Sequence, residues 1–255
     1  MFSVVKKKLK HKHRKQIVMK WIYTLSLITA AAIFLPSCTK KLNGSGNYIT
    51  QDRTIGAFTG VENDGDFEVI LEQKATHSLS INAEDNILSE IETVVVNGIL
   101  KIYFRRNNVS VRHGQILVTV GAPMLKNLYM HGSGVIKSDA IWKAENLQLS
   151  VSGSGSILLE SLVENQAVAT ISGSGSIVMD GSAQYGNFNI SGSGKISGFN
   201  YNTKEADITI SGSGNCEVQV ANKLMAFISG SGSVFYKGNP QVNSSISGSG
   251  KVIKQ

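Results

Sequence analysis

The tetrapeptide Ser-Gly-Ser-Gly returns six times in this chain, at residues 152–155, 172–175, 191–194, 211–214, 229–232 and 247–250, and a variant, His-Gly-Ser-Gly, stands at 131–134. The first glycines of successive copies are 21, 20, 19, 20, 18 and 18 residues apart. A flexible Gly/Ser linker has no reason to recur at a nearly constant spacing. The spacing therefore predicts a structural unit of about 20 residues that is repeated along the chain.

Apolar residues flank every copy at alternate positions. The residue before the tetrapeptide is Met130, Val151, Ile171, Ile190, Ile210, Ile228 or Ile246, and the second residue after it is Ile136, Ile157, Ile177, Ile196, Cys216, Val234 or Val252. A period of two with many β-branched side chains predicts strands on both sides of the tetrapeptide. If the alternation continues through the tetrapeptide, its glycines point inward and its serines point outward.

A unit this short cannot bury its apolar face alone, so copies must stack on one another. The sequence thus predicts an all-β fold, a right-handed parallel β-helix (a β-solenoid) with 18–21 residues per coil. Each coil would lie ~4.8 Å from the next. A β-propeller blade needs about 40 residues, so the repeat is too short for that fold. The spacing also drifts and does not stay at a multiple of six, as a left-handed hexapeptide helix would require.

The paired glycines of each copy have two explanations. They are Gly132, Gly134, Gly153, Gly155, Gly173, Gly175, Gly192, Gly194, Gly212, Gly214, Gly230, Gly232, Gly248 and Gly250. Glycine permits positive φ at a corner, and it also lets neighbouring backbone approach closely. The sequence does not separate corner geometry from close packing, and we predict a structural role for all of these glycines.

The N-terminal segment has the features of a secretory leader. Of the chain's 25 Lys and Arg residues, eight lie in residues 1–37, which leaves 17 against 18 Asp and Glu from residue 38 onward. The folded part is therefore close to neutral, and it lacks the basic excess of a nucleic-acid-binding protein. An apolar run, Trp21–Leu35, follows the basic residues and precedes "LPSC". This order predicts a signal peptide over residues 1–37.

Cys38 directly follows the predicted cleavage site, as in the lipobox of bacterial lipoproteins, so we expect it to be lipidated. A plain cleaved signal or an uncleaved anchor are the alternatives. Met19 also begins a complete signal and is an alternative start. Residues 38–50 are expected to form a flexible tether, and residues 51–255 one β-solenoid, with irregular coils in 51–127 and regular coils in 128–255. With Cys38 lipidated, Cys216 has no partner for an intramolecular disulfide.

Residues 51–127 also have the pattern of strands. The segments "DFEVILEQ" (66–73), "HSLSINA" (77–83) and "QILVTVGAP" (115–123) alternate, and "ETVVVNGILKIYF" (92–104) predicts a hairpin with its turn at Asn97-Gly98. One short window, "AEDNILSEIE" (83–92), is compatible with a helix. We expect this half to continue the solenoid instead of forming a separate domain.

The segments "FTGVENDGDFEVILEQ" (58–73) and "SLSINAEDNILSEIETVVVNGILKIYF" (78–104), followed by the Ser-Gly-Ser-Gly coils, resemble the glycine-rich head GIN domain family. The resemblance covers about residues 51–255, and members of that family are described as auto-transporter adhesins. It implies a right-handed β-helix in the envelope of Bacteroidota-like bacteria. A fold does not by itself define a function.

Motifs of the common catalytic sites are absent from the sequence. The glycine pairs fit neither a nucleophile elbow nor a phosphate-binding loop, and the coils lack the aspartate of calcium-binding repeats. We therefore expect no catalytic residue, metal or cofactor. Acidic residues alternate at Glu62, Asp64, Asp66 and Glu68 and would share one strand face. We expect this face to be a solvated surface, with a cation site as the alternative. Cys216 stands in an apolar column, which predicts a buried small hydrophobe.

Aromatic residues in the variable segments are the candidates for ligand contact, with core filling as the alternative. They are Tyr185, Tyr201, Phe235 and Tyr236. The sequence thus predicts a non-enzymatic lipoprotein, exported and held at the outer membrane, that binds a glycan or a protein. The alternatives are an envelope carbohydrate-active enzyme, which would require carboxylates on neighbouring coils, and a purely structural component. Because the strands of the end coils have open edges, we expect that the protein can form a homodimer.

Overall fold

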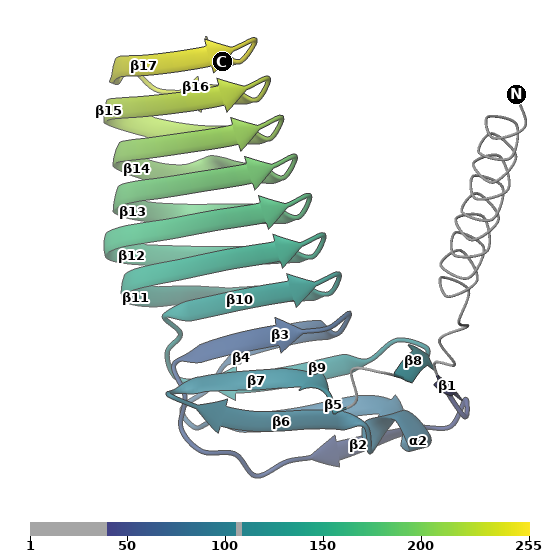
Figure 1. The fold of residues 1–255 in the computed structure, drawn as a ribbon. Coiled ribbons are helices and arrows are strands. Elements are labelled where there is room, and N and C mark those ends of the chain that lie inside the picture. The colour runs from purple at the N-terminus through teal and green to yellow at the C-terminus, as the bar shows by residue number, and fades with distance from the viewer. Residues whose placement is uncertain (1–39, 106–108) are drawn as a thin grey trace, which may run out of the picture. The chain divides into compact units, whose positions relative to one another are not determined.

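Regular coils stack along one axis in the C-terminal half of the chain (Figure 1). In the computed structural model, which describes residues 40–105 and 109–255, each long strand begins after one tetrapeptide and ends in the next. The strands are β10 (Asn127–Gly132), β11 (Val135–Gly153), β12 (Ser156–Gly173), β13 (Ser176–Gly192), β14 (Lys195–Gly212), β15 (Asn215–Gly230), β16 (Ser233–Lys237), β17 (Gln241–Gly248) and β18 (Lys251–Lys254). Successive coils pair in parallel, and the chain climbs in the right-handed sense, so the predicted fold is confirmed.

The register of these coils stacks like residues on like. Ile171 pairs with Ile190, and Ile157 pairs with Ile177. The inward residues form apolar columns that run along the whole stack, and from Met130 to Ile228 the column before the turn is at most 3% exposed. Burying each Ile or Val side chain stabilises the fold by very roughly 1.5–3 kcal/mol. The columns thus hold the stack together without a disulfide.

Each tetrapeptide turn hydrogen-bonds to the turn below it. The carbonyl of Gly153 accepts from the N–H of Ser174 at 2.9 Å, and the carbonyl of Gly155 accepts from Ser176 at 3.0 Å. The same pair of bonds recurs up the column, because Gly173 then accepts from Ser193 at 2.9 Å. The turns are therefore stacked as closely as the strands.

Both roles proposed for the glycines are present, and each glycine of a pair has its own. The first glycine of every copy has a positive φ, between 108° at Gly132 and 126° at Gly230, which side-chain-bearing residues rarely adopt. The second glycine has no such φ, but it touches the coil below. A Cβ on Gly175 would lie 2.5 Å from the Gly155 carbonyl oxygen. Corner geometry and close approach are thus both required.

Residues 40–126 build the base of the column. Its strands are β1 (Lys40–Asn43), β2 (Tyr48–Asp52), β3 (Gly60–Asp64), β4 (Glu68–Gln73), β5 (Ser78–Glu84), β6 (Ile91–Val96), β7 (Ile99–Phe104), β8 (Val109–Arg112) and β9 (Leu117–Ala122). β3 and β4 pair in parallel with β10 and β11, and β7 and β9 extend this stack downward. Below them β5 and β6 run antiparallel and close the core, with α2 (Asp85–Leu88) packed beside β5.

The predicted hairpin is present, since β6 and β7 pair across Asn97 and Gly98, whose φ values are 51° and 75°. Residues 41–255 cluster as one compact unit with a continuous core, so the irregular half is part of the same domain. The domain thus carries its own core without the leader. In the described part of the chain, no helix has the length and apolar character needed to cross a membrane. The predicted signal peptide and Cys38 lie outside the described residues.

An eighth copy of the turn stands at the base, where the sequence pattern did not reveal it. Asn63 takes the place of Met130 in the apolar column, and Glu68 pairs with Val135. Asn63 is 0% exposed, and its Nδ2 donates to the Phe67 carbonyl at 2.8 Å. An asparagine in the column and Phe67 in place of the second glycine hide the repeat, as does the long excursion before β10.

The segment expected to be a flexible tether is instead fixed over its described part, from residue 40 to residue 50. β1 pairs with β8, and β2 runs antiparallel to β5. The loop between them is held by side chains: Gly46 N–H donates to Glu84 Oε1 at 2.9 Å, and Ser45 N–H donates to Asn86 Oδ1 at 3.0 Å. The Gly-Ser loop is ordered because acceptors on β5 and α2 satisfy its backbone donors.

Replacing either glycine of one central turn is expected to destabilise the fold. Gly173→Ala places a side chain at φ 124°, and Gly175→Ala places Cβ against a carbonyl oxygen. Each change should lower the free energy of unfolding by roughly 1–3 kcal/mol. Ser174→Ala, in the same turn but exposed, is the matched control and should change it little. Denaturant unfolding measures all three, and equal losses would contradict this account of the turn.

Candidate functional site

The outward side chains of the strands before each turn form one regular surface, here named the front wall. Its three columns are Tyr129, Ser150, Thr170, Asn189, Thr209, Phe227 and Ser245; Asn127, Gln148, Val168, Asn187, Asp207, Met225 and Asn243; and His131, Ser152, Ser172, Ser191, Ser211, Ser229 and Ser247. Asp207 is the one Asp, Glu, Lys or Arg in these columns. The front wall is thus almost free of charge.

The front wall presents hydroxyl and amide groups at the spacing of the coils, ~4.8 Å. Asn189 and Asn187 already bond to each other at 2.7 Å, which fixes the amide orientation on that strand. Phe227 is 46% exposed on the same wall and offers an aromatic face. Hydroxyls, amides and an aromatic ring on a rigid surface suit a long, neutral, hydroxyl-rich ligand.

Tyr185 borders the front wall one column further along the strand. Its hydroxyl donates to the Asp207 carboxylate on the next coil. Burial raises the pKa of Tyr185 to about 12, and the hydrogen bond to Asp207 adds to the shift. Tyr185 is therefore held as a hydrogen-bond donor at the edge of the wall and keeps its proton at neutral pH.

The other three predicted contact residues do not join Tyr185. Tyr201 is 1% exposed and fills the core, so its expected ligand contact is wrong. Burial raises the pKa of Tyr201 to about 12, against a smaller opposite effect of the Ser161 hydroxyl. Tyr236 packs partly buried against the core, opposite Val218 on the coil below. Phe235 lies after the turn, on the wall behind, so the four aromatics form no common site.

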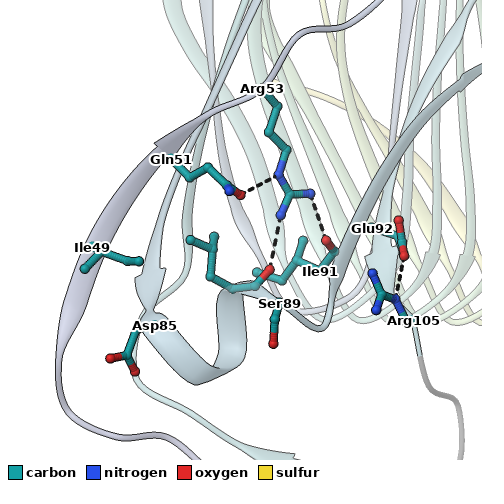
Figure 2. Close-up of a pocket in the computed structure, with 9 residues that line it drawn as sticks. Ile49, Gln51, Arg53, Asp85, Ser89, Ile91, Glu92 and Arg105 are labelled. Carbon is teal, nitrogen blue, oxygen red and sulfur yellow. Dashed lines mark hydrogen bonds and ion pairs between the residues drawn. The ribbon is translucent and has the colours of Figure 1, made fainter.

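A pocket opens at the base between β2, α2 and β6 (Figure 2). It encloses about 440 Å³, and its lining includes Ile49, Arg53 and Arg105. The Arg53 guanidinium is directed at backbone: Nη1 donates to the Ile91 carbonyl at 2.8 Å, and Nη2 donates to the Leu88 carbonyl at 3.1 Å. Its Nε donates to Gln51 at 3.0 Å. Arg53 thus ties three base elements together.

Ionic contacts in this pocket are also internal. Arg105 pairs with Glu92 at 2.5 Å, as Figure 2 shows at the right of the pocket. Burial lowers the pKa of Arg53 from its ordinary value, and Glu92 partly opposes this shift. The Arg53 guanidinium nevertheless remains cationic, because an arginine is not deprotonated in proteins. These contacts stabilise the base of the column.

A second hollow lies along the corner of the central coils, and sequence reasoning missed it. It encloses about 540 Å³ and is lined by Glu160, Asp180, Gly181, Ser182, Asn200, Asn202 and Leu162. Glu160 pairs in register with Asp180, and Asp180 pairs with Asn200. Two carboxylates thus stand on neighbouring coils. Their spacing in sequence equals one coil length, which was the signal available for finding them.

The alternating acidic residues do not form the predicted shared face. β3 ends at Asp64 and β4 begins at Glu68, so a turn interrupts the series. Glu62 pairs with Lys101 at 2.8 Å and Glu68 with Lys137 at 2.5 Å, while Asp66 lies 3.2 Å from His113. Over residues 40–105 and 109–255, no group of three or more His, Cys, Asp or Glu side chains is arranged to hold a metal ion.

Cys216 lies in the apolar column, as predicted. It is 0% exposed between Ile196 and Val234, and its thiol is free. Complete burial raises the pKa of this thiol far above its ordinary value. Cys216 is therefore a core residue with a protonated, shielded sulfur.

Comparison with known families identifies the chain. A family model described as "Putative auto-transporter adhesin, head GIN domain" matches residues 57–240. The chain belongs to this family. The resemblance found in the sequence is thereby confirmed, and the family description supports an adhesin-like binding domain. The curated proteins gave no match.

Solved structures of similar proteins share the head GIN fold. A "putative adhesin" of Bacteroides fragilis has a TM-score of 0.79 and 22% identity, covering 84% of this chain and all of its own. A "putative lipid binding protein" of Parabacteroides distasonis has a TM-score of 0.70 and 25% identity, covering 85% and all of its own. A "putative adhesin" of Parabacteroides merdae has a TM-score of 0.68 and 20% identity, covering 85% and 99%. None of these descriptions is that of an enzyme.

Replacing Arg53 by lysine is expected to loosen the base. A single ammonium cannot donate to Gln51, Leu88 and Ile91 together, so Arg53→Lys should lower the free energy of unfolding by roughly 2 kcal/mol. Hydrogen exchange should quicken in α2 and β6. Arg105→Lys is the matched control, since the Arg105 side chain is 55% exposed and makes an exposed ion pair. Equal effects of the two changes would contradict the bridging role of Arg53.

Proposed function

We propose that this head GIN protein is a non-enzymatic binding protein of the cell envelope, anchored by lipid on Cys38, whose front wall binds an extended glycan. The observation that carries the proposal is the wall itself, three stacked columns in which Asp207 is the one charged side chain apart from the titratable His131. Neutral glycans offer hydroxyl groups that such side chains can pair, and Asp207 is the one carboxylate of the wall that binding would desolvate.

The position of β1 supports a short anchor. β1 begins at Lys40, two residues after Cys38. Two residues span at most about 7 Å, so a lipid on Cys38 would keep β1 beside the membrane. The last coil lies at the other end of the sheet from β6. The column would then extend by about 30 Å from its base and present the front wall to the surroundings.

The hollow at Glu160 and Asp180 favours one second candidate, a carbohydrate-active enzyme. Paired carboxylates are the acid and base of most glycosidases. Asn200, Asn202 and Ser182 would contact sugar hydroxyls there. This candidate predicts product release that is lost in Glu160→Gln and Asp180→Asn. The non-enzymatic proposal predicts binding to the same polysaccharides without any product.

A glycan array with the purified domain, residues 41–255, tests the front wall. We expect saturable binding of neutral polysaccharides, and Phe227→Ala should weaken it by up to roughly tenfold, since the exposed ring stacks on the sugar. Phe235→Ala, on the wall behind, is the matched control and should leave the affinity unchanged. A lipid vesicle arm belongs in the same screen, because the similar Parabacteroides distasonis protein is described as lipid binding.

Product release by the wild-type domain would overturn the non-enzymatic proposal in favour of the second candidate. Equal loss of binding in both phenylalanine variants would place the ligand elsewhere than on the front wall. Binding to vesicles alone would replace the glycan by a lipid as the ligand.

The anchor is tested by replacing its cysteine. Cys38→Ser is expected to move the protein from the membrane fraction to the soluble fraction and to abolish the mass increase that lipidation causes. Cys216→Ser is the matched control, because this buried cysteine takes no part in anchoring. The Cys38→Ser protein could instead stay in the membrane fraction, with a mass that shows the leader still attached. That result would indicate an uncleaved anchor.

A further inference from the structure

The last coil leaves the end of the apolar core uncovered. Ile246 is 42% exposed, whereas Ile228, one coil below in the same column, is 3% exposed. Val242 and Val252 are also only partly buried against the core. At the base, by contrast, β5, β6 and α2 close the core, and Ile87 and Ile91 are at most 2% exposed. The two ends of the column are therefore different.

The backbone of this coil is open as well. Within the described ranges, β17 pairs only with β15 and β18 only with β16, so one edge of each strand is unpaired. Open edges are commonly protected by charged side chains or proline. β17 reads Gln-Val-Asn-Ser-Ser-Ile-Ser-Gly and contains neither. Its edge has free hydrogen-bonding groups, no charge and an exposed isoleucine.

We propose that two copies of this chain join end to end through their last coils, about a two-fold axis that pairs β17 with the same strand of the partner. An axis through Ser244 makes the antiparallel pairing self-complementary. Inward Val242 then lies opposite the partner's Ile246, and outward Asn243 lies opposite the partner's Ser245. Apolar residues meet apolar ones, hydroxyl meets amide, and the core continues from one copy into the other.

The return strand of the end coil, β18, carries Lys251 and Lys254, whereas β17 carries no charged residue. The proposed contact between the two copies is therefore made through β17.

This arrangement deepens the proposed function and rests on it in one respect. If Cys38 carries the lipid, the two anchors of the pair lie at opposite ends of a double column. A single flat membrane cannot hold both anchors with the columns upright. The pair would then connect two membranes, and the adhesive partner of the chain would be a second copy on the opposing surface.

Sedimentation of the soluble domain, residues 41–255, tests the pairing without any lipid. We expect a reversible dimer, and Ile246→Lys should raise the dissociation constant at least tenfold, because it places a buried charge at the contact. The change should be tolerated in the monomer, since Ile246 is already exposed there. Phe227→Lys introduces the same charge at an equally exposed site one coil below and should leave the dimer intact.

A cysteine on the axis gives an independent readout. Ser244→Cys should form a disulfide-linked dimer under mild oxidation, because the two copies of residue 244 face each other. Ser211→Cys, exposed in the middle of the stack, should remain uncrosslinked. A wild-type domain that is monomeric throughout a concentration series, or a dimer that survives Ile246→Lys, would overturn the proposal.

Vesicles that carry the lipidated chain separate this inference from the anchor. We expect such vesicles to cluster, and Ile246→Lys should prevent clustering while the protein stays bound to the vesicles. Loss of the protein from vesicles would contradict the Cys38 anchor, leaving the solution dimer unaffected. Firm attachment together with a monomeric soluble domain would contradict the end-to-end pairing alone.

Discussion

The hydrogen bonds between stacked turns are the constraint on which the rest of the structure depends. In most parallel sheets the turns are free to diverge, because only the strands are paired. Here the carbonyls of both turn glycines accept from the coil above, so the turns keep the same ~4.8 Å spacing as the strands. At that distance a side chain on either glycine would collide with backbone. The glycine pair must therefore return once per coil, and the repeat in the sequence is the direct result.

Tight stacking of the turns determines the surface as well as the core. Because the coils keep register, each outward position becomes a column of side chains instead of an isolated one. A ligand that follows the axis therefore meets similar groups on successive coils. Through this repetition, side chains such as Thr170 and Asn189, which are weak contacts individually, would together form the proposed binding surface. Rigidity adds to the effect, since little conformational entropy remains to be lost on binding.

The sequence predicts most of the structure of the regular half and little of the structure of the base. Strand positions, inward columns and the burial of Cys216 follow from alternation alone, because every copy repeats the same pattern. The turn that follows Asn63 was not predicted, because an asparagine in the apolar column indicates the end of the repeat pattern. In the structure, the Asn63 amide is buried there because it donates a hydrogen bond to the Phe67 carbonyl. The order of residues 40–50 depends on Glu84 and Asn86, which are distant in sequence, so local composition suggested a flexible tether. Glu160 and Asp180 can be recognised as neighbours in the sequence only if the length of one coil is known. That length is reliable only after the register of the strands is known.

The two ends of the column differ in how the last apolar layer of the core is covered, and this difference bears on function. A stack of coils always exposes its last apolar layer unless something covers it. At the base the chain supplies its own cover, with antiparallel strands and the Arg53 guanidinium bonded to the backbone at Leu88 and Ile91. The far end shows the unprotected layer and edge of β17. A closed base next to the predicted anchor and an open far end give the column a direction. In the proposed arrangement, contacts through sheet edges are made at the far end, and the front wall stays free along its whole length for the proposed glycan ligand.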